Sequence, residues 1–431
     1  MTKYAEYKDS GIALVPRIPH TWEAKPLKFI ADCNVRVLPE KTDDEAEITY
    51  IDIGSVNYGQ GICGTQEFTF ANAPSRARRI VKTGDTIIST VRTYLKAIAY
   101  IDDEYNDNIC STGFAVYTPR PGVNQRFFFY ALNADWFVSD VERYSVGISY
   151  PAITSTALSA LKTILPPISE QERIVDYLDH RTAKIDSLLA DLQSQAEMLD
   201  RYKRELIAEA VTKGLDKSVT MKDSGVDWIG EIPAHWKITK NKWLFRKVKN
   251  IVGSDQEKYP VLSLSIKGVI EKDREDNTGK IPAQYEDYYQ IVECGNLLLC
   301  LFDMDVTPCI VGYIPQDGIV SPAYSHYTSV NPKSASMRFY YWWFLYMQHQ
   351  RLFVSLSNNI RNSINAEHFG SMPSPQPPID EQEKIAEYLD KKTAKIEGLI
   401  ADITAQMEKL KQYRQIVIHD AVTGKIKVTE G

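Results

Sequence analysis

Apolar side chains recur every seven residues through two long stretches of the chain, 166–214 and 377–424. We call each set of positions spaced by seven residues a line. In the first stretch, the main line and the line three residues after it hold Leu178, Ile185, Leu188, Leu192, Gln195, Leu199, Tyr202 and Leu206. In the second stretch, the equivalent positions are Leu389, Ile396, Leu399, Ile403, Gln406, Leu410, Tyr413 and Val417. A heptad spacing sustained over so many turns is typical of a coiled-coil seam. The pattern therefore predicts two long helices.

The two stretches are copies of one another and begin in the same way. Each follows a pair of prolines, and Ser169 and Asp380 are the expected N-cap residues because each has a glutamate three positions on. Gln195 and Gln406 interrupt the apolar seam at the same place in each copy. A polar seam residue costs stability but fixes register, so we expect the two helices to pair with each other. The alternative is that each helix packs separately on its own domain.

A second repeated segment precedes each globular part of the chain. KDSGIALVPRIPHTW ends at Trp22, and KDSGVDWIGEIPAHW ends at Trp236. The repeat predicts four regions: a domain at 1–165 with its leading segment 1–22, a long helix at 166–217, a domain at 218–376 with its leading segment 218–236, and a second long helix at 377–431. A period of about 210 residues is too long for a solenoid, so the chain is a duplicated module.

The two globular parts alternate short apolar runs with aromatic-rich segments. Strand-like runs occur at 48–56, 84–92, 259–270 and 295–303, helical segments at 125–137 and 337–350, and polar turns at 147–154 and 358–365. Strands and helices mixed within one domain of about 140 residues predict an α+β fold. The long helices are alike whereas the globular parts differ, as expected of two different binding surfaces on one repeated frame.

Composition excludes membrane-spanning and secreted proteins from the expected classes. The 431 residues include no apolar run of the ~18 residues that a membrane helix needs, and the N-terminus lacks the apolar core of a signal peptide. The cysteines show no CxxC pair and no metal-ligand spacing with the histidines, so we expect reduced thiols in a cytoplasmic protein. A net charge of −6 argues mildly against a general nucleic-acid binder but permits local basic faces.

The chain shows no motif that predicts catalysis. Gly59, Gly61 and Gly64 match GxGxxG, but strand and turn residues follow them where a dinucleotide site needs a helix to begin, so we interpret them as a turn. Motifs of P-loop proteins, zinc proteases and serine hydrolases are absent, and Asn331-Pro332 lacks the Pro-aromatic continuation of adenine methyltransferases. We therefore expect no catalytic, cofactor or metal site in this chain, which would not be an enzyme by itself.

Two basic clusters remain as candidates for ligand contact. The first is Arg76, Arg78, Arg79 and Lys82 with Arg92 and Lys96 nearby, and the second is Lys237, Lys240, Lys242, Arg246, Lys247 and Lys249. Phosphate binding needs such clusters, and base readout needs Arg or Lys at a groove edge. Clusters of this size are also common on solvated faces. The aromatic helical segments are expected to be core and not base-stacking platforms.

In these features the chain resembles the specificity subunit of a type I restriction-modification system. The likeness rests on the whole layout, on GDTIISTVR (84–92), STGFAVYTP (111–119) and GISYPAIT (147–154), and on the helix start PPxxEQExIxxYLD, which occurs twice. It covers essentially the full length. The second domain departs from the pattern, with SPAYSHY (321–327) in place of STGFAVY and NNIRNSIN (358–365) in place of GISYPAIT. The resemblance therefore implies the fold of this domain but not its contact residues.

The resemblance implies two target recognition domains, each reading one half of a bipartite, asymmetric site in double-stranded DNA. The long helices would form an antiparallel coiled coil with a pseudo-two-fold internal repeat, acting as a spacer and as the docking surface for two methylation subunits, with restriction subunits in the full complex. S-adenosylmethionine, ATP and magnesium would belong to those partners. The competing hypothesis is a coiled-coil protein-interaction scaffold without DNA specificity, for which the acidic net charge is the best support.

Overall fold

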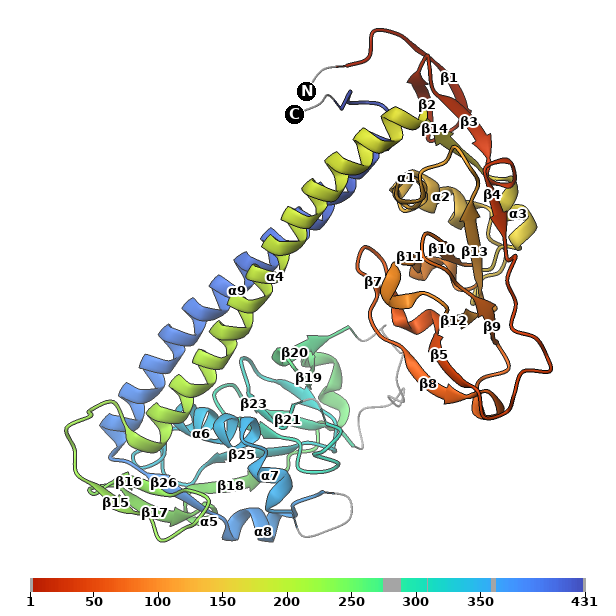
Figure 1. Cartoon of the computed structure of the whole chain (residues 1–431). Coiled ribbons are helices and arrows are strands. Elements are labelled where there is room, and N and C mark those ends of the chain that lie inside the picture. The colour runs from red at the N-terminus through yellow and green to blue at the C-terminus, as the bar shows by residue number, and fades with distance from the viewer. Residues whose placement is uncertain (1–2, 274–287, 308, 358–361, 429–431) are drawn as a thin grey trace. The chain divides into compact units, whose positions relative to one another are not determined.

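Two long helices, α4 (Ile168–Lys213) and α9 (Ile379–Val422), carry the heptad stretches (Figure 1). The computed structural model describes residues 3–273, 288–307, 309–357 and 362–428. The chain divides into two units, of which unit 1 is Met1–Leu192 with Ala405–Gly431 and unit 2 is Gln193–Thr404. Each unit thus contains one globular domain and a part of each long helix.

Each long helix begins immediately after the second proline of its proline pair. The carbonyl oxygen of Pro167 accepts hydrogen bonds from the backbone N–H groups of Glu170 and Gln171 at 2.9 and 3.0 Å, and α9 begins in the same way. A proline suits this place because its missing N–H would have no helical partner. Ser169 and Asp380 lie inside the first turn, so the predicted N-cap positions are wrong.

The seam of each helix follows the predicted seven-residue line but not the line three residues after it. The first line is buried or half-buried at Leu178, Ile185, Leu192, Leu199 and Leu206 in α4, and at Leu389, Ile396, Ile403, Leu410 and Val417 in α9. The second predicted line is exposed at Leu188, Gln195, Tyr202, Leu399, Gln406 and Tyr413. The covered second line lies four residues after the first, at Thr182, Leu189, Ala196, Lys203, Ala210, Thr393, Ile400, Met407, Arg414 and Ala421. The assignment of Gln195 and Gln406 as register residues is therefore wrong.

Ion pairs between the helices provide the polar contacts that the glutamines were expected to make. In unit 1, Arg414 Nε lies 2.9 Å from Asp186 Oδ1, and in unit 2, Lys203 Nζ lies 3.4 Å from Glu397 Oε1. The first part of α4 thus pairs with the last part of α9 in unit 1, and the remaining parts pair in unit 2, so the helices are antiparallel. The predicted pairing of the two helices with each other is confirmed.

The domain of unit 1 contains two four-stranded sheets. One has the antiparallel order β11 (Ile98–Tyr100), β10 (Thr86–Ser89), β13 (Phe114–Pro119) and β4 (Ala31–Cys33). The other has the order β8 (Gln66–Thr69), β5 (Glu47–Ile51), β12 (Ile109–Ser111) and β9 (Ala77–Ile80), in which β5 and β12 are parallel. Its helices are α1 (Gln125–Leu132), α2 (Asp135–Arg143) and α3 (Ser155–Ala160).

The domain of unit 2 repeats this topology with different residues. One sheet has the order β18 (Phe245–Val248), β25 (Ser325–Ser329), β22 (Leu297–Leu299) and β23 (Val311–Tyr313). The other has the order β20 (Gly268–Lys272), β19 (Val261–Ser265), β24 (Gly318–Val320) and β21 (Gln290–Val292), again with its second and third strands parallel. Its helices are α5 (Asn241–Leu244), α6 (Met337–His349), α7 (Leu352–Ser355) and α8 (Ala366–Ser371).

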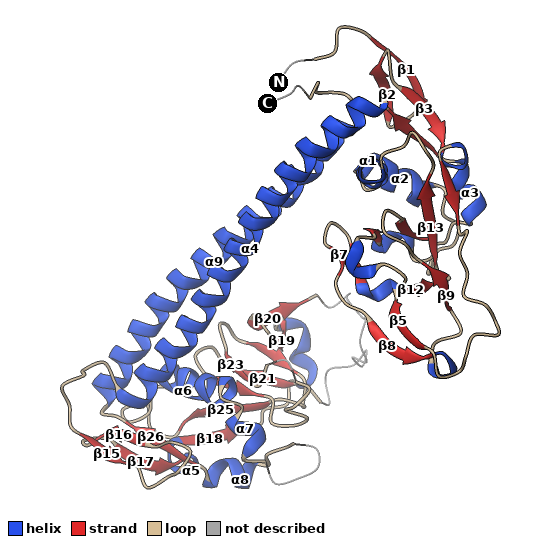
Figure 2. Ribbon diagram, viewed as in Figure 1, coloured by secondary structure: helices blue, strands red, loops and turns tan. Residues whose placement is uncertain are grey.

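Smaller elements complete both units. Two-stranded sheets pair β1 (Tyr7–Ile12) with β2 (Val15–Pro19), β3 (Glu23–Pro26) with β14 (Lys162–Leu165), β6 (Val56–Asn57) with β7 (Gly61–Ile62), β15 (Met221–Asp223) with β16 (Glu231–Pro233), and β17 (Lys237–Lys240) with β26 (Pro373–Gln376). The 3-10 helices are η1 (Leu27–Phe29), η2 (Ile53–Ser55), η3 (Phe70–Asn72), η4 (Thr93–Leu95), η5 (Asp103–Tyr105) and η6 (Gly253–Lys258). Figure 2 shows strands and helices interspersed through each domain, which confirms the α+β prediction.

The core of each unit joins its leading segment, its aromatic helix and the ends of both long helices. Trp22 and Trp236, which end the two leading segments, are 0% exposed. Phe127 and Phe128 of α1 pack in the same core as Trp22, and Phe339 of α6 packs in that of Trp236. The expectation that the aromatic helices are core is therefore confirmed.

Several local predictions differ from the observed elements. The run 259–270 is a hairpin of β19 and β20, and the segment 125–137 forms two helices because Ala134 between them is extended (φ −75°, ψ 140°). Gly59 and Gly61, with φ of 77° and 79°, shape the turn between β6 and β7, so the turn interpretation of GxGxxG is confirmed. In the predicted turn 358–365, residues 358–361 lie outside the described part of the chain.

Candidate nucleic-acid interface

The first basic cluster lies around strand β9 of unit 1. Arg76 is exposed just before the strand, and the Arg78 guanidinium lies over the ring of Phe70, 4.9 Å from its centre. Arg79 is half-buried, and burial lowers the pKa of its guanidinium. Of these three arginines, Arg76 is therefore the most open to an anionic ligand.

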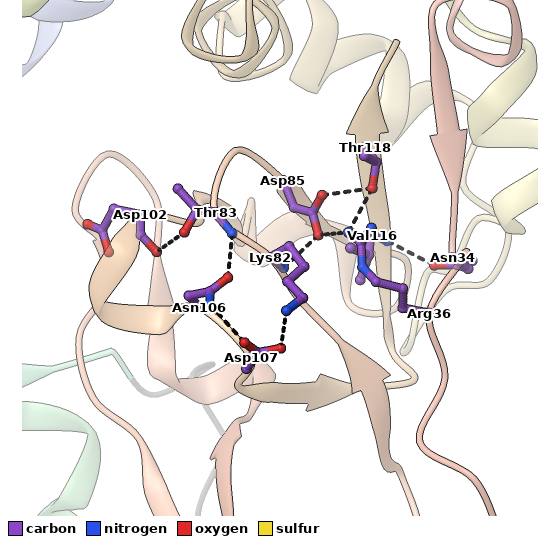
Figure 3. Close-up of polar contacts among 10 residues, drawn as sticks. All are labelled: Asn34, Arg36, Lys82, Thr83, Asp85, Asp102, Asn106, Asp107, Val116 and Thr118. Carbon is purple, nitrogen blue, oxygen red and sulfur yellow. Dashed lines mark hydrogen bonds and ion pairs between the residues drawn. The ribbon is translucent and has the colours of Figure 1, made fainter.

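A polar network fixes the turn between β9 and β10 (Figure 3). The buried Asp85 carboxylate accepts hydrogen bonds from Arg36, from Thr118 Oγ1 at 2.7 Å and from the backbone N–H of Lys82 at 2.8 Å. The Lys82 ammonium in turn pairs with Asp107. Lys82 thus has a partner within its own domain, and Arg36, which the sequence did not single out, positions the turn.

Gly84 allows this turn to approach helix α1 closely. Its φ is 91°, and a Cβ placed on it would lie 2.3 Å from the side-chain amide of Gln125. A larger residue would therefore displace the end of the Gln125 side chain and would be strained at this positive φ. The contacts of Asp85 and Gly84 fix the start of β10. The position of the loop that follows β10 is therefore also defined.

That loop, 90–96, carries the exposed Arg92 and the half-buried Lys96. Both residues have positive φ, 51° and 53°, and they flank the 3-10 helix η4. Lys96 Nζ lies 3.8 Å from Glu142 Oε1, whereas Arg92 is exposed and lies over the ring of Tyr150, 5.4 Å from its centre. Left-handed backbone is costly for residues with a Cβ, and such strain concentrates at functional sites. The loop is therefore a candidate contact surface.

An apolar hairpin, 144–153, lies beside this loop. The backbone N–H of Ile153 donates to Thr90 O at 2.9 Å, which fastens the hairpin to the loop. Ile148 at its tip is fully exposed, and the Tyr150 side chain is 68% exposed. Exposed rings and apolar side chains beside an arginine can stack on bases or wedge between them. The sequence predicts only a polar turn here, although the isoleucine and the tyrosine within GISYPAIT indicate an apolar contact surface.

The second basic cluster follows three consecutive elements of unit 2, β17, α5 and the edge strand β18. All six predicted side chains are exposed: Lys237, Lys240, Lys242, Arg246, Lys247 and Lys249. Among the residues that the structure describes, none of the six takes part in an ion pair. Lys242 Nζ lies 5.3 Å from the ring centre of Trp243, which is 68% exposed. Uncompensated positive charge of this kind attracts a phosphate backbone.

The two basic clusters occupy places that are not equivalent in the two domains. The first surrounds β9, whose counterpart in the order of the second domain is β21. The second follows β17 and β18, whose counterparts in the first domain are β3 and β4. The sequence groups these residues by charge but does not place them on elements. Each domain therefore presents its positive charge from a different part of a common fold.

Within the described ranges, no group of three or more His, Cys, Asp or Glu side chains is arranged to hold a metal ion. No helix in the same part of the chain is long and apolar enough to cross a membrane.

Comparison with known proteins relates this arrangement to one family. A family model described as the type I restriction modification DNA specificity domain matches residues 19–198 and 301–409. A proposed type I restriction enzyme MjaX specificity subunit from Methanocaldococcus jannaschii is 22% identical, covering 96% of this chain and 96% of its own length. The type I restriction enzyme MjaVIII specificity subunit of the same organism is 24% identical and covers 70% of both chains.

A solved structure has the same fold over almost the whole chain. It comes from work on complex assembly and conformational transition of the type I R-M system, and it matches with a TM-score of 0.70 at 20% identity. The match covers 95% of this chain and 99% of the other. The similarity of fold therefore extends over both domains and both long helices.

Proposed function

Because the chain belongs to the family of type I restriction-modification DNA specificity proteins, we propose that its two domains read the two different halves of one bipartite DNA sequence. The observation that carries the proposal is the repetition of one sheet topology with different surface residues. A common fold presents equivalent loops to DNA, and different side chains on those loops select different bases. The target is therefore asymmetric.

The exposed basic residues supply the attraction to phosphate. In the first domain this residue is Arg76, whereas Arg92 lies beside the apolar tip of hairpin 144–153. In the second domain they are the six cations of β17, α5, β18 and the residue after it. Local clusters of this size can bind DNA although the whole chain is acidic, because the field near a surface depends on nearby charges.

The long helices are the proposed docking surface for the methylation subunits. Leu188 and Tyr202 of α4 are 44% and 51% exposed, and Leu399 and Tyr413 of α9 are 44% and 46% exposed. Apolar side chains lined up on an exposed helix face favour a protein partner. These residues occupy equivalent positions on the two repeated helices, which supports the binding of two methylation subunits. The helices would also act as the spacer between the two DNA-reading domains.

Chemistry would then reside in the partners and not in this chain. S-adenosylmethionine would bind to the methylation subunits, and ATP and magnesium to the restriction subunits of the full complex. This chain would contribute recognition without catalysis, in the cytoplasm where the DNA lies.

Selection from a library of random duplex DNA tests the proposal. The complex of this chain with its methylation subunits should enrich two different short sequences separated by a gap of fixed length, about half a turn to one turn of DNA. Methylation subunits without this chain are the control and should enrich no motif. No enrichment by the complex would favour the protein-interaction scaffold, and a continuous or palindromic motif would contradict the division between two domains.

A further inference from the structure

The loop after β10 in the first domain and the loop after β22 in the second begin with the same pattern of backbone hydrogen bonds, although the second closes over two more residues. The first loop is 90–96, and the second is 301–307. Four backbone hydrogen bonds (donor first) hold the first loop: Ser89–Ala97 at 2.8 Å, Ile153–Thr90 at 2.9 Å, Thr93–Pro151 at 3.4 Å and Leu95–Arg92 at 2.9 Å. Their counterparts are Cys300–Ile310 at 2.8 Å, Ile364–Leu301 at 2.8 Å, Met304–Asn362 at 3.2 Å and Val306–Asp303 at 3.2 Å. The two loops are therefore structurally equivalent where they begin.

The equivalence extends to a strained residue. Arg92 has φ 51°, and its counterpart Asp303 has φ 44°. The residue after each is buried, with Thr93 4% and Met304 3% exposed. A left-handed residue anchored by a buried neighbour points its side chain in a direction fixed by the fold. Neither position is a glycine, although glycine would remove the strain.

The side chains on these two loops carry opposite charge. The first loop has Arg92 and Lys96, whereas the second has Asp303 and Asp305. Arg92 and Asp305 are exposed, and Asp303 is half-buried. A carboxylate that faces the phosphate backbone is repelled by it, so an acidic loop on a DNA-reading domain is useful only where it meets hydrogen-bond donors of the bases. In the major groove those donors are the exocyclic amino groups of cytosine and adenine.

We propose that this loop is the specificity-determining element of each domain, with Arg92 reading a guanine and Asp303 reading the amino group of a cytosine or adenine. The inference rests on the proposed function and names the residues that carry it. The guanidinium of Arg92 donates to the O6 and N7 atoms of guanine, which only that base presents together. The Asp303 carboxylate accepts from an amino group and disfavours guanine and thymine, whose major-groove edges present only acceptors.

The test compares Arg92→Gly and Asp303→Gly in complexes with the methylation subunits, using selection from random duplex DNA. Glycine suits the left-handed backbone at both places, so each change removes a side chain and leaves the loop intact. Arg17→Ala and Asp227→Asn, which alter exposed charges on the leading segments, are the matched controls. Assembly of each complex and its melting temperature show that the variants are folded.

Arg92→Gly should lower the preference for guanine at one position of one half-site by about 5- to 150-fold and leave the other half-site unchanged. Asp303→Gly should lower the preference for cytosine or adenine at one position of the other half-site. If Arg92→Gly weakened binding equally at all sequences, Arg92 would be a phosphate contact. If Asp303→Gly left binding unchanged, or strengthened it equally at all sequences, base readout by Asp303 would be excluded. Either result overturns the inference. A wild-type complex without sequence preference would instead overturn the proposed function.

Discussion

Glu170 and Gln171 explain why one short motif opens both long helices. Glu170 Oε2 accepts from Trp22 Nε1 at 3.0 Å, while Gln171 accepts from the backbone N–H of Asn124 and donates to Pro166 O, both at 2.8 Å. The counterparts in unit 2 are Glu381 with Trp236 at 3.1 Å, and Gln382 with the Ser336 N–H and with Pro377 O, both at 2.8 Å. Two adjacent side chains thus join the helix to its leading segment and to its domain.

Replacing Gln171 by leucine should destabilise unit 1. The glutamine is 1% exposed, and leucine of similar volume leaves the half-buried N–H of Asn124 and the buried carbonyl of Pro166 without their partner. An unsatisfied buried polar group costs about 1–3 kcal/mol, so the unfolding free energy should fall by about 2 kcal/mol or more. The melting transition of unit 1 measures it. Ser187→Leu, on the exposed face of the same helix within unit 1, is the control, and equal melting of the two variants would contradict the anchoring role.

The sequence could identify these residues but not their partners. Trp22, Trp236 and the EQE motif were visible because they occur twice. Asn124 and Ser336 lie where the two halves no longer match, so no repeat marks them. For the same reason the equivalence of Arg92 and Asp303 needs the backbone, since neither charge nor local sequence relates them.

At the scale of elements, the long helices show how a heptad pattern can be correct in period and wrong in face. Apolar residues lie both three and four residues after the main line, as at Leu188 and Leu189 after Ile185. A seam between two helices covers only one of these lines, and in this structure it covers the line four residues after the main one. The sequence could not choose between them, because the apolar stripe is wider than pairing of the two helices requires.

Lysine in place of Tyr202 or Tyr413 should weaken binding of the methylation subunits without unfolding the helices. Both rings are about half exposed, with 51% and 46% of their surface accessible, so the folded chain loses little packing. Buried tyrosines at protein interfaces are frequent hot spots, and we expect a loss of at least about tenfold in affinity, measured by calorimetry. The neighbouring exposed changes Arg201→Lys and Gln412→Lys are the controls. Equal affinity for all four variants would remove this line from the interface.

At the scale of the whole molecule, the order of the parts was predictable and their internal topology was not. The repeated helices and leading segments fixed the sequence of domain, helix, domain, helix. The strand orders, with one parallel pair in each domain, depend on contacts between distant short strands such as β5 and β12, which leave no periodic signal in the sequence. Long-range pairing of this kind is the part of a fold that local patterns describe least.

The net charge of −6 is a further property of the whole chain that misleads when it is taken alone. Acidic residues concentrate on the long helices, as in the ion pairs of Asp186 and Glu397, whereas the cations of β17, α5 and β18 are exposed and unpaired among the described residues. Charge therefore supports the DNA-reading role only when it is resolved onto elements.

Sequencing of the modified bases in genomic DNA, from cells that produce this chain together with its methylation subunits, decides whether the chain selects DNA. One bipartite motif should be modified, with two different halves and a gap of fixed length, and its modification should disappear when this chain is omitted. A continuous or palindromic motif, or the same modified sites without this chain, would contradict the assignment of the two halves to its two domains.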